Sequence, residues 1–164
     1  AIAAGVLINT AGLLQAQAQQ TGSETTSEVS DRLQVGNVVG IANNNQKIEV
    51  LNASVRLSAG SDPINLSKAS YTLSSSENAT IINGSETTGR LDFTRKQSLD
   101  SDTSILSDQE DLMIVSFNLT TISGVDPLND GSKLTIITSA PAGGKSYKQA
   151  SAPKRVRAGE TNIH

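Results

Sequence analysis

The apolar residues of this chain follow one period at the start and another from about residue 46 onward. Residues 1–14 are apolar on nearly every side, interrupted only by Asn9 and Thr10. A narrower apolar stripe then continues at spacings of seven, four and four residues, which keep one helical face. Its members are Ala18, Thr25, Val29 and Leu33. No Pro interrupts residues 1–35, so the pattern predicts one long helix there, about 50 Å in length at its usual rise per residue.

From residue 46 the period changes to two, and β-branched residues become frequent. Alternation of this kind predicts half-buried strands. Turn-forming segments such as Asn129-Asp130-Gly131 and Gly60-Ser61-Asp62-Pro63 separate seven candidates. The candidates are residues 47–59, Ile64–Leu73, Ala79–Ile82, Arg90–Arg95, Leu112–Leu119, Lys133–Thr138 and Ser146–Ala150. Short strands at this spacing predict an antiparallel β-sandwich of immunoglobulin-like type.

Together these regions predict an α+β fold class, with a long N-terminal α-helix followed by an immunoglobulin-like antiparallel β-sandwich. We expect the helix over residues 1–35, a hinge over residues 36–45 and an outer domain over residues 46–164. The apolar stretch 1–14 is shorter than the ~20 residues that cross a bilayer. It lacks the positively charged start of a secretory signal and begins on Ala rather than Met. We therefore expect it to be the remainder of a longer hydrophobic segment.

The composition leaves few ways to support the core of such a sandwich. The 164 residues include only four aromatic side chains, no Trp and no Cys. The aromatic residues are Tyr71, Phe93, Phe117 and Tyr147. A core poor in rings buries little apolar surface, and the absence of Cys excludes disulfides, thiolate metal sites and cysteine catalysis. Oligomerisation is the support that remains for so thin a core.

Charge is distributed unevenly along the chain. Residues 1–131 hold 7 basic and 15 acidic side chains, a net charge of −8, whereas residues 132–164 hold 6 basic and 1 acidic, a net charge of +5. Such asymmetry suits binding to nucleic acid or to an anionic membrane, or attraction between opposite faces of neighbouring subunits. No aromatic residues interleave the basic run as base stacking requires, so we favour subunit contacts and expect no nucleic-acid partner. The segment Lys154–Arg157 is either an interface element or an exposed tail.

The stretch AIAAGVLINTAGLLQ, with its polar helical continuation to about Leu33, resembles the N-terminal region of archaellins. Archaellins are the filament subunits of the archaeal swimming organelle and are similar to type IV pilins. The likeness is closest to halophilic archaea and extends to LSDQEDLMIVSFNL and GSKLTIITSAPAGGK. The resemblance implies a helical filament core, a β-sandwich sheath, and a precursor cut by a prepilin-type peptidase. The subunit would meet the membrane only transiently before joining an extracellular, cell-surface filament.

The apolar helix is the predicted polymerisation element. Six large apolar side chains would leave water on assembly: Ile2, Val6, Leu7, Ile8, Leu13 and Leu14. Each gains roughly 1.5–3 kcal/mol when fully buried, so together they supply on the order of 10 kcal/mol before association and ordering costs. The expected partners are identical or paralogous filament subunits. The alternative is a helix that packs on its own sandwich.

Five Asn-x-Ser/Thr sequons are candidates for N-glycosylation, a bulky surface modification. They begin at Asn52, Asn65, Asn78, Asn83 and Asn118. Asn78 and Asn83 lie near predicted turns, whereas Asn52 and Asn118 lie inside predicted strands and qualify only if they face outward. Apart from such glycans we predict no cofactor.

Residues typical of catalysis or metal binding are scarce. The only His is His164 at the end of the chain, and no G-x-S-x-G motif is present. Gly143–Ser146 resembles the end of a P-loop, but residue 139, where the first Gly should stand, is Ser, so we predict a turn between strands. The acidic run from Asp100 to Asp111 would suit a hard cation, but its spacing does not fit a calcium loop. We interpret it as a solvated loop, and predict neither an enzyme nor a metal site.

The sequence therefore predicts a structural subunit of the archaellum that polymerises through its N-terminal helix. One alternative is a subunit of a type IV pilin-like adhesion filament, which the sequence separates poorly from an archaellin. Another is a secreted β-sandwich that binds carbohydrate or protein. In that case Tyr71 and Tyr147 would be the contact aromatics.

Overall fold

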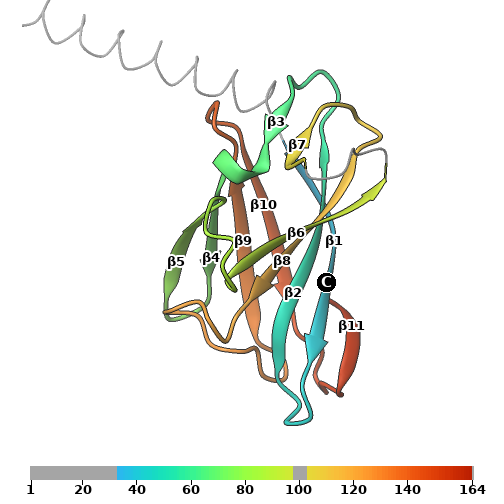
Figure 1. Ribbon diagram of the computed structural model, residues 1–164. Coiled ribbons are helices and arrows are strands. Elements are labelled where there is room, and N and C mark those ends of the chain that lie inside the picture. The colour runs from blue at the N-terminus through green and yellow to red at the C-terminus, as the bar shows by residue number, and fades with distance from the viewer. Residues whose placement is uncertain (1–32, 98–102, 164) are drawn as a thin grey trace, which may run out of the picture.

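The computed structural model describes residues 33–97 and 103–163 (Figure 1). These residues form two antiparallel β-sheets packed against each other, with a small two-stranded sheet at one end. The five-stranded sheet has the order β11-β1-β2-β8-β6, and the four-stranded sheet has the order β10-β9-β4-β5. The small sheet pairs β3 with β7.

The strands of the five-stranded sheet are β11 (Gly159–Ile163), β1 (Leu33–Ala42), β2 (Ile48–Leu57), β8 (Leu112–Asn118) and β6 (Leu91–Gln97). Those of the four-stranded sheet are β10 (Lys145–Ser151), β9 (Lys133–Ser139), β4 (Ser70–Ser74) and β5 (Ala79–Asn83). The small sheet consists of β3 (Ile64–Asn65) and β7 (Ile105–Leu106), and a 3-10 turn, η1 (Leu66–Lys68), follows β3.

The core lies between the two large sheets and is lined by alternate residues of each strand. In β8, for example, Met113, Val115 and Phe117 are buried while the residues between them are half-buried. Tyr71 of β4 meets Phe117 of β8 edge to face across the core, with ring centroids 5.6 Å apart, and lies 6.3 Å from Phe93 of β6. Three of the four aromatic residues of the chain therefore meet at one point, which joins the two sheets.

The predicted α+β class is wrong for the described residues, which contain strands and the single 3-10 turn η1 but no α-helix. Strand β1 occupies Leu33–Ala42, where the sequence predicted the last turn of the helix and the hinge. Leu33 belongs to the core opposite Leu57 rather than to a helical stripe. The β-branched residues of this segment suit a strand, and Gly36 and Gly40 do not favour a helix.

The remainder of the predicted helix, residues 1–32, lies outside the described residues. The six predicted polymerisation side chains lie there too: Ile2, Val6, Leu7, Ile8, Leu13 and Leu14. The division of the chain into a helix and an outer domain therefore stays a prediction, although the strand prediction for residues 47–59 is confirmed by β2. Within the described ranges, no helix has the length and apolar character needed to span a bilayer.

One predicted strand, Ile64–Leu73, is divided into β3, η1 and β4. Asn65 causes the break, because its side-chain oxygen caps η1 by accepting from the backbone N–H and the hydroxyl of Ser67, at 3.0 and 2.7 Å. Past the break, the hydroxyl of Tyr71 donates to the carbonyl oxygen of Leu66 at 3.0 Å. The turn is therefore held from both sides.

Candidate assembly surfaces

An apolar row crosses the outward face of the four-stranded sheet. Tyr147 of β10 pairs with Ile137 of β9, Ile137 with Thr72 of β4, and Thr72 with Ile81 of β5. Side chains at paired positions lie on the same face of an antiparallel sheet, so these four residues form one line across all four strands. Tyr147 and Ile81 are 68% and 67% exposed, the highest values for large apolar residues in the described chain. We call Tyr147, Ile137, Thr72 and Ile81 the outer stripe.

Polar rows border the outer stripe on both sides. One row consists of Lys145, Ser139, Ser70 and Asn83, and the other of Gln149, Thr135, Ser74 and Ala79. Isolated apolar residues on a protein surface need no explanation, but three large apolar side chains in one row between mostly polar rows indicate a contact surface.

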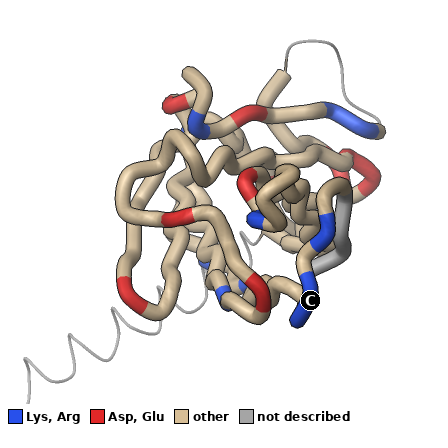
Figure 2. The backbone as a smooth tube through the Cα atoms, turned by 90° about the horizontal axis from the view of Figure 1, so that it is seen from below, with Lys and Arg blue, Asp and Glu red and all other residues tan. Residues whose placement is uncertain are grey.

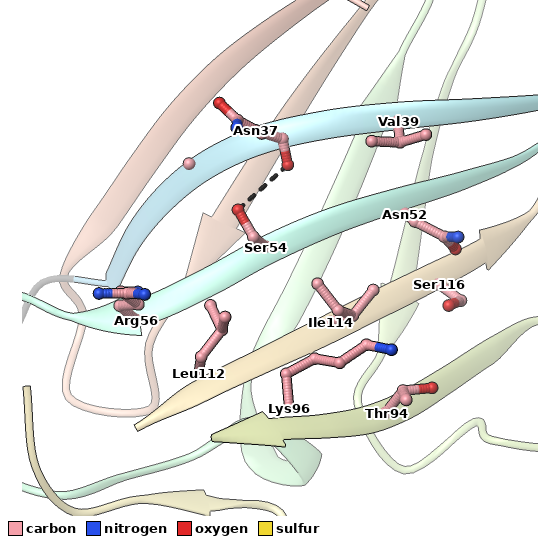
Figure 3. Close-up of a pocket in the computed structure, with 11 residues that line it drawn as sticks. Asn37, Val39, Asn52, Ser54, Arg56, Thr94, Lys96, Leu112, Ile114 and Ser116 are labelled. Carbon is pink, nitrogen blue, oxygen red and sulfur yellow. Dashed lines mark hydrogen bonds between the residues drawn. The ribbon is translucent and has the colours of Figure 1, made fainter. Parts of the chain in front are cut away.

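The opposite face of the sandwich is hollowed. A groove of about 580 Å³ runs over the outward side of β1, β2, β8 and β6 (Figure 3). We define the outer groove by six of its residues: Val39, Asn52, Ser54, Leu112, Ile114 and Ser116. Figure 3 shows the side chains of β2 and β8 lying on the same side of the sheet, with Thr94 and Lys96 of β6 beside them. The groove therefore combines an apolar floor with short polar side chains.

In this groove, Asn52 has a hydrogen-bond acceptor without a donor. Its side-chain oxygen is buried and has no hydrogen-bond partner among the described residues. The neighbouring Ser54 is engaged, because its hydroxyl donates to the carbonyl oxygen of Asn37 at 3.2 Å. A buried acceptor without a donor costs stability, so Asn52 favours a partner that brings one.

Charged residues stand at the two ends of the groove. Arg56 and Lys96 lie beside Leu112 at one end. At the other end, Asp92 of β6 pairs with Ser116, and Ser116 pairs with Asn52. In Figure 2, basic positions gather next to the C-terminal end of the described chain, in keeping with the positive charge of residues 132–164.

The five sequons differ in accessibility. Asn78 in the β4–β5 turn and Asn83 at the end of β5 are exposed. Asn65 is half-buried, and its side-chain oxygen accepts from Ser104 at 2.9 Å in addition to its capping bonds. Asn52 and Asn118 both face outward and are half-buried.

Asn118 forms its own turn. Its side-chain oxygen accepts from the backbone N–H and the hydroxyl of Thr120, at 3.2 and 2.6 Å. The Asn and Thr of this sequon are therefore hydrogen-bonded to each other.

The acidic run forms no common site in the part of the chain that is described. Asp108 and Glu110 are exposed, whereas Asp111 is buried and its carboxylate accepts from the backbone N–H groups of Ser107 and Asp108, at 2.7 and 2.9 Å. Asp100 and Asp102 lie outside the described residues, as does His164. Across residues 33–97 and 103–163, no three acidic or His side chains converge on a metal position.

The structure places the two other segments that the sequence singled out. Gly143 and Gly144 form the β9–β10 turn, which confirms the predicted turn, and Gly143 has a φ of +102° that favours glycine. Within Lys154–Arg157 the basic side chains are exposed, but Val156 is buried and its N–H donates to Asp130 at 2.8 Å. This segment is therefore anchored to the core through Val156. It leads into β11, a strand that the sequence did not predict.

The comparisons with known proteins identify the family. A model of the archaeal-type flagellins matches residues 1–147. The chain belongs to the archaeal-type flagellin family. Flagellin B1 of Halobacterium salinarum is 34% identical over 161 residues, which are 96% of this chain and 81% of the relative. Flagellin B1 of Natrialba magadii is 32% identical over 161 residues, 93% of this chain and 80% of the relative. The resemblance to archaellins of halophilic archaea is confirmed.

Two solved structures share the fold. Archaeal flagellin FlaB1 from Methanocaldococcus jannaschii matches with a TM-score of 0.69 and 14% identity, over 80% of this chain and 95% of that chain. The archaeal flagellum of Methanospirillum hungatei strain JF1 matches with a TM-score of 0.61 and 12% identity, over 97% of this chain and 87% of that chain.

Membership of the archaeal-type flagellins gives the chain its function. It is a structural subunit of the archaellum, the filament on the archaeal cell surface, and not an enzyme. It works by assembling with other flagellin subunits. The surfaces described above are therefore to be interpreted as candidate contacts within a filament.

Proposed function

We propose that this flagellin polymerises by burying residues 1–14 among the same segments of identical or paralogous subunits, while the β-sandwich forms the outer sheath. The observation that carries the proposal is the apolar opening of the chain, whose six large side chains are named above. The family match supports it, because it includes this opening as well as most of the sandwich.

The sandwich supports the same proposal by having a core of its own. Buried residues from both large sheets, from Leu33 to Val156, form one continuous cluster. A domain with a complete core does not need its N-terminal segment to cover that core. The exposed large apolar residues of the described chain are also few, and the two most exposed belong to the outer stripe.

Before assembly, residues 1–14 need another apolar environment, and a membrane provides one. We propose that the membrane is a transient partner that the subunit leaves when it joins the filament. Burial of six side chains supplies on the order of 10 kcal/mol in either environment, so transfer between them requires only that neighbouring subunits replace lipid. Nucleic acid has no place in this proposal.

The proposal is tested by adding one charge inside the apolar stretch. Leu7→Asp and Leu13→Asp should abolish filaments on cells, as seen by electron microscopy. The β-rich circular dichroism of the isolated subunit should remain, because both residues lie far from the sandwich in the chain. Gln17→Asp is the matched control and should leave filaments intact. Filaments of normal appearance from Leu7→Asp cells would contradict the proposal.

We further propose that N-linked glycans, where present, are carried by Asn78 and Asn83. Both are exposed at the β4–β5 edge of the sandwich, where a bulky group meets no neighbouring strand. The other three sequons are disfavoured, because Asn52, Asn65 and Asn118 are half-buried and Asn52 also lies in the outer groove.

A further inference from the structure

The outer stripe and the outer groove lie on opposite faces of the same sandwich. The stripe belongs to the outward side of the four-stranded sheet and the groove to the outward side of the five-stranded sheet. One subunit cannot bring them together, so a contact between them requires two copies. Contacts between two different patches are heterologous, and they repeat along an open helical assembly when the rotation does not close a ring.

We propose that the Tyr147 end of the outer stripe of one subunit docks into the outer groove of a neighbouring copy in the filament. The proposal rests on the proposed function, because polymerisation brings the two sandwiches side by side. It adds a second contact, between outer domains, to the one made by residues 1–14. The occupant of the groove is thus a second copy of this chain.

The apolar parts of the two surfaces match. Tyr147 projects from the sheet with two thirds of its surface in water, and the half-buried Ile137 lies next to it on β9. Leu112, Ile114 and Val39 supply the apolar side of the groove, which at about 580 Å³ has room for an aromatic ring. Docking removes both surfaces from water, and a buried aromatic anchor in a pocket is a typical centre of an interface.

The polar parts match as well. The phenolic hydroxyl of Tyr147 is a hydrogen-bond donor on the stripe, and the buried side-chain oxygen of Asn52 in the groove has no donor among the described residues. A neighbouring tyrosine would supply the missing bond. This pairing requires an unmodified Asn52, because a glycan there would fill the groove.

Charge gives the docking its direction. Lys145 precedes Tyr147 by two residues on the same face of β10, and Asp92 ends the groove row that contains Asn52 and Ser116. Arg56 and Lys96 stand at the other end of the groove and repel Lys145. The favoured orientation therefore places Lys145 toward Asp92. Asn83 lies at the far end of the stripe face, so a glycan there stays outside the groove.

The absence of cysteine from the chain makes a cross-linking test clean. Full-length subunits carrying Tyr147→Cys and Ser116→Cys are assembled into filaments and treated with a mild oxidant or a short bismaleimide. We expect a ladder of covalent multimers on denaturing gels. Each single variant, and the pair Tyr147→Cys with Asn129→Cys in an exposed turn, should give none. Filaments that form normally but yield no ladder would overturn this docking contact while leaving polymerisation through residues 1–14 intact.

The same contact can be tested without cysteines, by measuring the temperature at which filaments dissociate. Tyr147→Asp should lower the temperature at which filaments dissociate, whereas Gln149→Asp, on the same face of the same strand, should not. Tyr147→Phe should lower it less, and only when Asn52 is present, so Tyr147→Phe should have no effect in an Asn52→Ala background. Equal dissociation temperatures for Tyr147→Asp and Gln149→Asp, or a glycan found on Asn52 in filaments, would overturn the proposal.

Discussion

The buried hydroxyl of Ser146 donates a hydrogen bond to the main-chain carbonyl oxygen of Leu33. Ser146 belongs to β10 in one sheet, and Leu33 is the first residue of β1 in the other. The bond therefore closes the seam between the sheets at the point where residues 1–32 join the sandwich.

Removal of this hydroxyl should weaken the seam. Ser146→Ala leaves the carbonyl of Leu33 without its donor, and an unpaired buried acceptor costs about 1–3 kcal/mol of stability. Ser139→Ala, on the outward side of the neighbouring strand, is the control and should change stability by less than about 0.5 kcal/mol. Urea denaturation of the dissociated full-length subunit measures both. Equal midpoints for the two variants would show that the bond contributes nothing.

Tyr71 should make the sandwich sensitive to alkali. Burial raises the pKa of its hydroxyl above the ordinary value of 10.0, so the folded state keeps a proton that the unfolded state loses. The unfolded state then binds fewer protons, and stability falls by about 1.4 kcal/mol for each pH unit above 10. Below pH 10 Tyr71 has no such effect, because both states are protonated.

Tyr71→Phe tests this assignment. The variant should lose about 0.5–1.5 kcal/mol at neutral pH, the net value of one hydrogen bond, since the carbonyl of Leu66 keeps the N–H of Ala69 as a donor at 3.3 Å. Its stability should then decline less steeply than that of the wild type between about pH 10 and pH 12, because the group responsible is gone. Urea midpoints measured across this range for both proteins give the comparison. Parallel curves would assign the alkaline loss to other groups.

Glycan positions are a separate prediction. Glycopeptide mass spectrometry of native filaments should find sugar on Asn78 or Asn83, and none on Asn65 or Asn118. Asn78→Gln and Asn83→Gln should remove the corresponding mass without changing the β-rich circular dichroism. Sugar on Asn65 would contradict the prediction, since Asn65 is half-buried whereas Asn78 and Asn83 are exposed.

The outer groove also explains where sequence reasoning failed. A strand such as β9 was predictable because its core side is apolar and its outward side is mostly polar. In β1 the outward residues Val39 and Ile41 are apolar too, and Val39 lines the groove. Apolar residues on both faces hide the period of two, so the segment was predicted to be a hinge.

The candidate surfaces themselves required the structure. Ile81 is more than fifty residues from Ile137 and Tyr147 in the sequence, and only the strand register puts the three in one row. Asn52 was predicted solely as a sequon, because nothing in its local sequence indicates a buried oxygen without a donor. Strand β11 was missed for another reason: its residues, Gly159–Ile163, contain one large apolar side chain and no alternation.

Two glycines allow a last prediction about close packing. A Cβ at Gly84, inside the Asn83 sequon, would stand 2.1 Å from the carbonyl oxygen of Leu66 and 2.8 Å from the carbonyl carbon of Ser67, both main-chain atoms of η1. Main chain cannot rotate away, so Gly84→Ala should cost about 3 kcal/mol or more by forcing β5 and η1 apart. At Gly36 the new Cβ would meet only the hydroxyl of Ser54 at 2.7 Å, which can rotate after giving up its bond to Asn37.

Gly36→Ala should therefore cost only about 1 kcal/mol, the value of one exposed hydrogen bond. The double variant with Ser54→Ala should recover part of that loss, because the obstructing atom is removed, whereas the same second substitution should not rescue Gly84→Ala. Urea midpoints of the two glycine variants, each with and without Ser54→Ala, measure these differences. If Gly84→Ala proved as mild as Gly36→Ala, β5 and η1 would have to be free to separate. The end of β5 that carries the Asn83 sequon would then be able to move relative to η1.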